Sequence, residues 1–264
     1  GFVPYLPHHI RQIFMLLAIS LSAFSLTAGA GVHWSVAVLG QELILHNADN
    51  LTLPFGIIFH IAAVLNVIYG WHERKAMEHT AGLAYAGAAI AAVHAGDLIT
   101  LFIWWEATAV TSVFLILASA NERANKAAMR YLLVQVASGV MLLAGASLYW
   151  REVGSLAFGS MELGSLATWL IFIAFGIKAA FPLLNGWLQD AYPEATILGT
   201  VMLSAFTTKL AIYAFARSFA GTEYLIWIGA AMTAFPVFFA VIENDLRRVL
   251  AYSLNNQLGF MIVA

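Results

Sequence analysis

The sequence predicts an all-α fold, a polytopic transmembrane helix bundle. Of the 264 residues, 62% are hydrophobic and only 10% are charged, and the mean hydropathy is +0.84. Soluble domains have about 25% charged and about 45–50% apolar residues. The apolar segments are also too long and too continuous for the alternating strands of a membrane β-barrel.

The composition excludes several classes of function. A formal charge of −2 argues against a strongly basic nucleic-acid binder. The absence of cysteine removes disulfides, thiolate metal sites, iron–sulfur clusters and thiol nucleophiles. We find no glycine-rich phosphate loop, HExxH motif or GxSxG motif. The sequence therefore predicts no cofactor, no metal site and no covalent catalysis.

Apolar runs of membrane-spanning length define the expected helices. We expect spans at residues 12–32, 52–71, 80–95, 98–118, 129–150, 165–184, 196–217 and 224–242, and the start of another from 249 onward. Only Gly96 and Asp97 separate the third span from the fourth, which predicts a tight antiparallel hairpin. The last run is shorter than the roughly 20 residues that a span needs. We therefore expect the chain to be part of a longer one.

Basic residues divide unevenly between the two sides of the predicted bundle. One side holds Arg151 and Arg217; the other holds Arg11, Arg74, Lys75, Arg123, Lys126, Arg130, Arg247 and Arg248. Cytoplasmic loops carry an excess of Lys and Arg. The distribution predicts a multi-pass protein with the Arg11 end cytoplasmic and residues 33–50 as an outer loop. We expect the membrane to be the inner membrane of a bacterium.

Three charged residues lie inside apolar spans, namely Glu106, Lys178 and Lys209. A charge at the centre of a membrane helix costs about 3 kcal/mol even on lenient insertion scales. Such residues usually face a polar interior and mark an ion or proton path. We therefore expect them to form a proton-translocation site. The alternatives are a structural ion pair for Glu106 and a structural cation for Lys209.

Lys178 also lies next to a predicted break in its helix. The segment reads GIKAAFPLLNGWL, and Pro182 has no N–H to donate to the carbonyl of Lys178. Broken helices at membrane depth are tolerated where they line protein or a watery cavity. The competing interpretation, a lysine that snorkels to the interface, is disfavoured by the long apolar run before it. Near Lys209, the hydroxyl of Thr208 could hold water.

The histidines carry a weaker signal. His60 and His94 lie in or at the ends of spans, where a facing pair could bind haem or relay protons. Without evidence of a facing pair at matched depth, we favour core or interfacial roles for both.

Five segments together resemble a known family. They read GDLITLFIWWE, MRYLLVQVASGVMLLAGA, GIKAAFPLLNGWLQDAYPEA, LSAFTTKLAIYAFAR and ENDLRRVLAYSLNNQLGFM, in that order. The chain resembles the proton-conducting antiporter-like subunits shared by respiratory complex I and Mrp-type Na+/H+ antiporters, and most of all the MrpD branch of these proteins. This resemblance implies two inverted five-helix repeats. Residues 1–79 would be N-terminal helices, 80–217 the first repeat, and 218–264 the start of the second.

The resemblance also implies roles for the charged residues. Glu106 would be the partner of Lys178 in the broken helix, and Lys209 would continue the row along which protons move. The chain departs from the family pattern at Asn185, where a His is common, and at Gln189, where a Pro is common. Asn does not titrate, so Asn185 is expected to hold a water molecule rather than relay a proton itself.

Three functions remain open on these grounds. The leading prediction is a proton-translocating subunit of a multi-subunit cation/proton antiporter. Its partners would be other membrane subunits, lipid, protons and, as the exchanged cation, Na+. The second is a non-conducting structural membrane subunit. The third is a subunit of a redox-driven pump, whose redox centres would be held by partner subunits.

Overall fold

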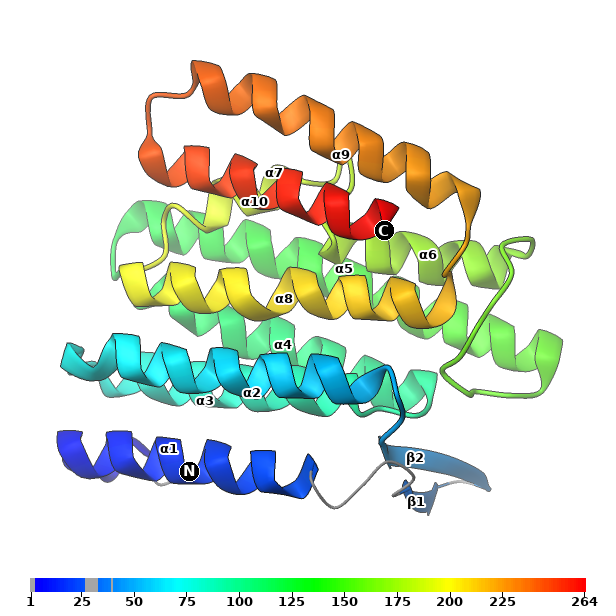
Figure 1. Cartoon of the computed structure of the whole chain (residues 1–264), viewed down its shortest axis with the longest axis horizontal. Coiled ribbons are helices and arrows are strands. Elements are labelled where there is room, and N and C mark those ends of the chain that lie inside the picture. Colours follow the sequence, from blue (N-terminus) through cyan, green and yellow to red (C-terminus); the bar gives the residue numbers. More distant parts are fainter. Residues whose placement is uncertain (1–2, 27–32, 39) are drawn as a thin grey trace.

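The computed structural model describes residues 3–26, 33–38 and 40–264, and its helices run side by side in one bundle (Figure 1). The long helices are α1 (His8–Leu26), α2 (Thr52–Tyr69), α3 (Ala76–Val93), α4 (Leu98–Leu117), α5 (Glu122–Val153), α6 (Leu166–Lys178), α8 (Ile197–Ser218), α9 (Glu223–Ile242) and α10 (Leu246–Val263). Short elements are the 3-10 turns Val3–Tyr5 and Gly70–His72 and the helix α7 (Gly186–Ala191). In Figure 1, α1 and α9 lie at opposite edges of the bundle.

The predicted helix bundle is confirmed, with changes at the helix ends. Within the described residues, five helices are long and apolar enough to cross a membrane: Thr52–His72, Leu98–Leu117, Glu122–Val153, Ile197–Ser218 and Glu223–Ile242. The predicted span 12–32 begins earlier, at His8, and its residues 27–32 lie outside the described part of the chain. Helix α5 extends beyond the predicted 129–150 at both ends.

The predicted outer loop at residues 33–50 is wrong as a loop, because most of it forms a β-hairpin. Strands β1 (His33–Val38) and β2 (Gln41–Asn47) pair antiparallel. The backbone N–H of Ile44 donates to Asp97 Oδ2 at 2.7 Å, and the N–H of Gly96 donates to the carbonyl of Ile44 at 3.0 Å. These bonds fasten the hairpin to the predicted tight turn between α3 and α4.

Asp97 also explains why α4 begins where it does. Its carboxylate accepts from the backbone N–H groups of Ile99 and Thr100, at 2.9 and 2.8 Å, and so caps the helix. Ser165 starts α6 in the same way, with a reciprocal bond between its backbone and Thr168. These caps set where α4 and α6 enter the bundle, and with it the depth of the charged residues they carry.

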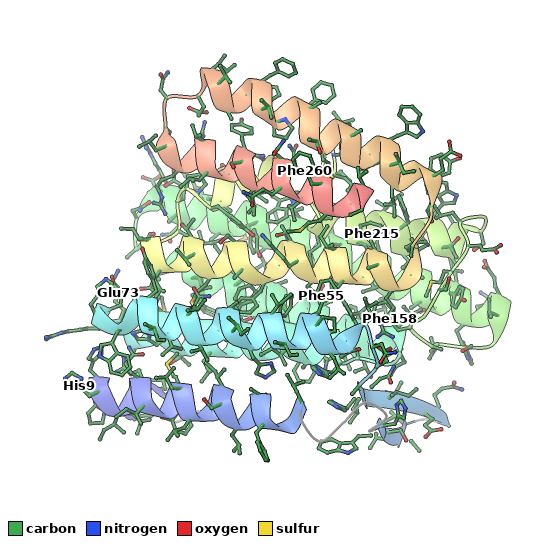
Figure 2. The ribbon with its side chains drawn as sticks, viewed as in Figure 1. His9, Phe55, Glu73, Phe158, Phe215 and Phe260 are labelled. Carbon is green, nitrogen blue, oxygen red and sulfur yellow. The ribbon has the colours of Figure 1, made fainter. Side chains whose placement is uncertain are left out.

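The hydrogen bonds of the basic residues show that these residues lie at two opposite ends of the bundle. At one end, Arg11 donates to the carbonyl of Arg74 at 3.3 Å, and Lys75 donates to the carbonyl of Ala118 at 3.0 Å. At the opposite end, beside the hairpin, Arg217 donates to Asp49 at 2.6 Å. Figure 2 shows His9 and Glu73 at the first end and Phe158 near the second. We call these the basic end and the hairpin end.

Close helix contacts hold α6 in place. A Cβ at Gly145 of α5 would stand 3.0 Å from the carbonyl oxygen of Ala167, so the two helices meet backbone to backbone. On its other side, α6 packs Phe172 and Phe175 against Phe215 of α8, with ring centroids 5.2 and 5.7 Å apart. The last turn of α6 is therefore fixed between α5 and α8.

The bonds around Asp49 predict how stability responds to acid. Partial burial opposes ionisation of this carboxyl, but hydrogen bonds from Thr52 and Arg217 outweigh it and lower the pKa below the ordinary 3.8. A lowered folded-state pKa gives stability that is complete above the unfolded value and is lost as the pH falls through the folded value. The effect is small, because the Asp49 side chain is 40% exposed and such pairs contribute about 1 kcal/mol or less.

We therefore expect the melting temperature of the protein in detergent to fall more steeply below about pH 4 than that of an Asp49→Asn variant. Differential scanning fluorimetry from pH 6 to pH 3 measures both slopes. Equal slopes for the two proteins would show that ionised Asp49 does not contribute to stability in this pH range.

Candidate functional site

Lys178 ends α6 as a completely buried cation, with 0% of its surface exposed. Its ammonium donates to the backbone carbonyl of Trp105 at 2.9 Å and to Thr108 Oγ1 at 2.8 Å, and lies 4.3 Å from the centre of the Trp105 ring. All three contacts come from α4. The side chain therefore points into the bundle and does not snorkel to the interface.

The predicted helix break next to Lys178 is confirmed, but it begins earlier than the predicted span 165–184 implies. Helix α6 stops at Lys178, and Pro182 lies in the connection to α7. Ala180 and Leu183 adopt left-handed φ values of 59° and 69°, each at a cost of roughly 1–2 kcal/mol for a residue with a side chain. The indole N–H of Trp187 donates to the carbonyl of Ile177 at 2.9 Å and satisfies one acceptor that the break frees.

Asn185 begins α7 without capping it. Its side chain makes no capping hydrogen bond, and its backbone carbonyl accepts from the N–H of Leu188 at 3.0 Å. The half-buried side chain therefore remains available for a polar role, as the sequence predicts. That role stays a prediction.

Glu106 lies on α4 directly after Trp105, yet it does not form an ion pair with Lys178 in the described structure. Its carboxylate lies against the bare backbone of α5, because a Cβ at Gly139 would come within 1.5 Å of Oε1. This buried oxygen has no hydrogen-bond partner among the described residues. The Lys178 ammonium therefore contacts α4, whereas the Glu106 carboxylate extends from α4 to α5.

Lys209 makes a different set of contacts from Lys178. On α8, its half-buried ammonium donates to the carbonyl of Ser204 in the same helix at 2.8 Å. The neighbouring Thr208 is completely buried, and its Oγ1 has no hydrogen-bond partner within the described chain. Neither of the two lysines pairs with an acid in the described residues. Neutral hydrogen-bonding groups therefore stabilise both ammonium groups.

The bundle also contains a group of buried hydroxyls that the sequence analysis did not predict. Tyr85 accepts from the backbone N–H of Thr207 at 2.8 Å and contacts its hydroxyl as well. Tyr192 donates to the carbonyl of Leu203 at 2.9 Å, and Tyr131 meets Ser112 at 2.8 Å. Tyrosines in apolar sequence are usually packing or interface residues, so only the helix arrangement reveals that these hydroxyls gather inside the bundle.

The rings of His60 and His94 are each hydrogen-bonded to a carbonyl one turn earlier in the chain. Nδ1 of His60 lies 2.7 Å from the carbonyl of Gly56, and Nδ1 of His94 lies 2.8 Å from that of Ile90. His94 stacks on His46 of the hairpin, with ring centroids 4.8 Å apart. Among the described residues, no three His, Asp or Glu side chains are placed to hold one metal ion.

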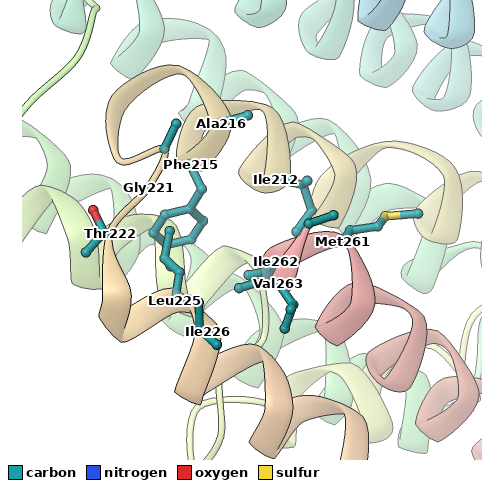
Figure 3. A pocket seen from close by; sticks show the side chains of 12 residues that line it. Ile212, Phe215, Ala216, Gly221, Thr222, Leu225, Ile226, Met261, Ile262 and Val263 are labelled. Carbon is teal, nitrogen blue, oxygen red and sulfur yellow. The ribbon is translucent and has the colours of Figure 1, made fainter.

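An apolar cavity of about 250 Å³ lies elsewhere, between α8, α9 and α10 (Figure 3). Phe215, Leu225 and Ile262 line it, and Thr222 provides its one hydroxyl-bearing side chain. It has no charged side chain, so we assign no proton-transfer step to it.

The fold and these buried charges define a polytopic integral membrane protein with an ionisable interior. A family profile described as "NADH:quinone oxidoreductase/Mrp antiporter, TM" matches residues 95–264. The chain belongs to this family and is an antiporter-like membrane subunit of the Mrp and complex I type, which confirms the resemblance.

Curated relatives carry names of quinone oxidoreductase subunits. NADH-quinone oxidoreductase subunit M of Escherichia coli (strain K12) is 28% identical, over 98% of this chain and 59% of that protein. NAD(P)H-quinone oxidoreductase chain 4 1 of Synechococcus sp. (strain JA-3-3Ab) is 27% identical, over 88% of this chain and 46% of that protein. The chain thus spans about half the length of the curated relatives it matches.

Solved structures share the fold. A chain of the Mrp complex from Dietzia sp. DQ12-45-1b gives a TM-score of 0.80 at 23% identity, over 96% of this chain and 52% of that one. A chain of respiratory complex I from Thermus thermophilus gives 0.84 at 21% identity, over 98% of this chain and 59% of that one. Both neighbours belong to multi-subunit membrane complexes.

Proposed function

We propose that this chain is a proton-translocating membrane subunit of a multi-subunit complex, with Glu106, Lys178 and Lys209 as its proton-carrying groups. The single observation that carries the proposal is Lys178, a completely buried cation held by a carbonyl, a hydroxyl and an indole ring. A permanent structural charge at this depth is expected to pair with an acid. An ammonium held by neutral dipoles can instead release its proton without leaving a buried carboxylate uncompensated.

The predicted Na+/H+ antiporter and the redox-driven pump both remain candidates for the whole complex. The description of the matching family profile includes Mrp antiporters and supports the first, for which we propose Na+ as the exchanged cation. The names of the curated relatives support the second, in which partner subunits would hold the redox centres. In either complex, this subunit would move protons and its partners would be other membrane subunits and lipid.

The two ends of the bundle support an orientation. We infer that the basic end, which includes Arg11, faces the cytoplasm of a bacterium, because short cytoplasmic loops are rich in Lys and Arg. We also keep residues 80–217 as one five-helix repeat, with α6 and α7 as its broken helix, 1–79 as the helices before it and 218–264 as the start of the second repeat.

The proposal is tested with membrane vesicles that contain the full complex and a fluorescent pH probe. We expect Glu106→Gln to reduce proton uptake at least about tenfold whether uptake is driven by a Na+ gradient or by NADH oxidation. Glu122→Gln, at the exposed start of α5, is the matched control and should keep wild-type uptake.

The energy source that supports proton uptake identifies the type of complex. Uptake driven only by a Na+ gradient identifies an antiporter, and uptake driven only by NADH oxidation identifies a redox pump. Wild-type uptake in the Glu106→Gln variant, with the complex assembled, would contradict the proton-carrying role. Loss of assembly in both Glu106→Gln and Lys178→Met would favour the structural-subunit alternative.

A further inference from the structure

Gln135 is a completely buried amide on α5, and neither its nitrogen nor its oxygen has a hydrogen-bond partner within the described chain. A buried polar group without a partner costs about 1–3 kcal/mol, so natural proteins rarely keep one unless it serves a site or binds water. Leu, Met or Ala would fill this apolar helix face without that cost. The position of Gln135 relative to the charged residues therefore matters.

The contacts between α4 and α5 place Gln135 at the level of Thr108. The two helices run antiparallel, since Trp105 Nε1 donates to Ser138 Oγ at 3.0 Å and Ser112 Oγ lies 2.8 Å from the hydroxyl of Tyr131. Thr108 lies one turn from both of its α4 neighbours in these pairs, and Gln135 lies one turn from both of its α5 neighbours. Residues one turn apart share a helix face, so the amide is opposite the hydroxyl that binds Lys178.

The contacts between α5 and α6 also place Gln135 next to Lys178. Ser138 Oγ donates to the carbonyl of Ala174 at 2.7 Å, and these helices also run antiparallel. One turn back along α5 is Gln135, and one turn forward along α6 is Lys178. Two independent helix pairings therefore bring the amide beside the buried ammonium.

Glu106 of α4 also reaches this part of α5. Its Oε1 lies against Gly139, one turn from Gln135, and is also without a hydrogen-bond partner in the described structure. The neighbouring hydroxyls are already used: Ser138 donates to Ala174, and Thr108 donates to the carbonyl of Trp105 at 2.7 Å. Gln135 supplies an unused donor and an unused acceptor between a carboxylate and an ammonium.

We propose that Gln135 is a positioning residue that holds water between Lys178 and Glu106, an inference that rests on the proposed function. The amide does not titrate, so it cannot carry the proton itself. Its N–H group can orient a water molecule toward the carboxylate, and its carbonyl can accept from the ammonium or from the same water.

The transfer that this water allows conserves charge and atoms. An N–H bond of the Lys178 ammonium breaks, and its proton goes to the water oxygen. The water passes one of its own protons to Oε1 of Glu106. The ammonium and the carboxylate become an amine and a carboxylic acid, and the water molecule is regenerated.

The test compares Gln135→Met with Gln12→Met in the full complex. Met has nearly the shape of Gln but no amide, and Gln12 on α1 is a second completely buried glutamine, with its Nε2 bonded to His79. We expect Gln135→Met to leave assembly and melting temperature unchanged or improved, to reduce proton uptake about tenfold, and to shift the midpoint of its pH profile. Gln12→Met should keep both the wild-type rate and the wild-type profile.

Gln135→Asn, which retains the amide, should recover part of the rate and the wild-type pH profile. A Gln135→Met complex that assembles with wild-type uptake and an unshifted profile overturns the inference. If Gln135→Met does not assemble, an altered pH profile in Gln135→Asn also overturns it. Uptake that is lost in Glu106→Gln but intact in Gln135→Met contradicts this inference alone, whereas intact uptake in Glu106→Gln contradicts the proposed function.

Discussion

Replacing Lys178 with Met is expected to reduce proton uptake by the assembled complex at least about 100-fold, which is typical of losing a group that carries a proton. Met fills a similar volume without an ammonium, and it brings no polar group whose burial would be unfavourable. The Thr108 hydroxyl keeps its own bond to the carbonyl of Trp105, so the substitution leaves no unpaired donor there. Uptake should therefore fall without a loss of assembly.

The matched control for this variant is Lys126→Met. Lys126 pairs with Glu122 at 2.7 Å on the exposed start of α5, and its side chain is 66% exposed. Removing this lysine should change neither uptake nor assembly. Co-purification of the partner subunits, measured by intact mass spectrometry, reports assembly for both variants. Wild-type uptake in an assembled Lys178→Met complex would contradict the role of Lys178.

Adding one methyl group at Gly139 is expected to have the second-largest effect. In Gly139→Ala, the new Cβ would stand 1.5 Å from Oε1 of Glu106 and 2.5 Å from its Cδ, so the carboxylate must move. The three nearest atoms all belong to the Glu106 side chain, so this side chain can move without separating the helices. Ala also favours a helix over Gly by about 1 kcal/mol. We expect uptake to fall about tenfold or more while thermal stability stays within a few degrees of wild type.

Alanine variants at two other glycines distinguish the effect of moving the carboxylate from the effect of a Gly-to-Ala change in a helix. A Cβ at Gly87 of α3 meets nothing within 4 Å, so Gly87→Ala should behave as wild type. A Cβ at Gly145 meets the carbonyl of Ala167 at 3.0 Å, so Gly145→Ala should lower stability by forcing α5 away from α6. The shorter side chain in Glu106→Asp should restore part of the uptake of Gly139→Ala. Full uptake in Gly139→Ala alone would show that the position of the carboxylate does not matter.

Hydrophobic run length was sufficient to predict the helices, because a membrane-spanning segment is apolar over about 20 residues. The hairpin at His33–Asn47 was missed since its residues were treated as a connecting loop, and bonds to Asp97 and His94 from distant sequence hold it in place. The break beside Lys178 was predicted from Pro182, but the helix stops before the proline. At this earlier end the indole N–H of Trp187 donates to the carbonyl of Ile177, a contact that the sequence analysis did not predict.

The charged members of the candidate site could be named from the sequence because charge in an apolar run is conspicuous. The contacts of these residues could not be. Lys178 is held by the carbonyl of Trp105, and every residue has such a carbonyl. Gln135 and Gly139 look ordinary in their helix, and they matter only because α5 runs antiparallel to both α4 and α6. The relative placement of helices decides which neutral groups meet the charges, and that placement depends on contacts distant in sequence.

The central claim is that Lys178 gains and loses a proton during transport. Solid-state NMR of the complex with ¹⁵N-labelled lysine measures this directly, with the Lys178 signal assigned by its disappearance in Lys178→Met. We expect the Nζ signal to change between its ammonium and amine positions within the pH range over which proton uptake occurs. A signal that stays at the ammonium position across that whole range would identify Lys178 as a fixed structural charge and contradict its role as a proton carrier.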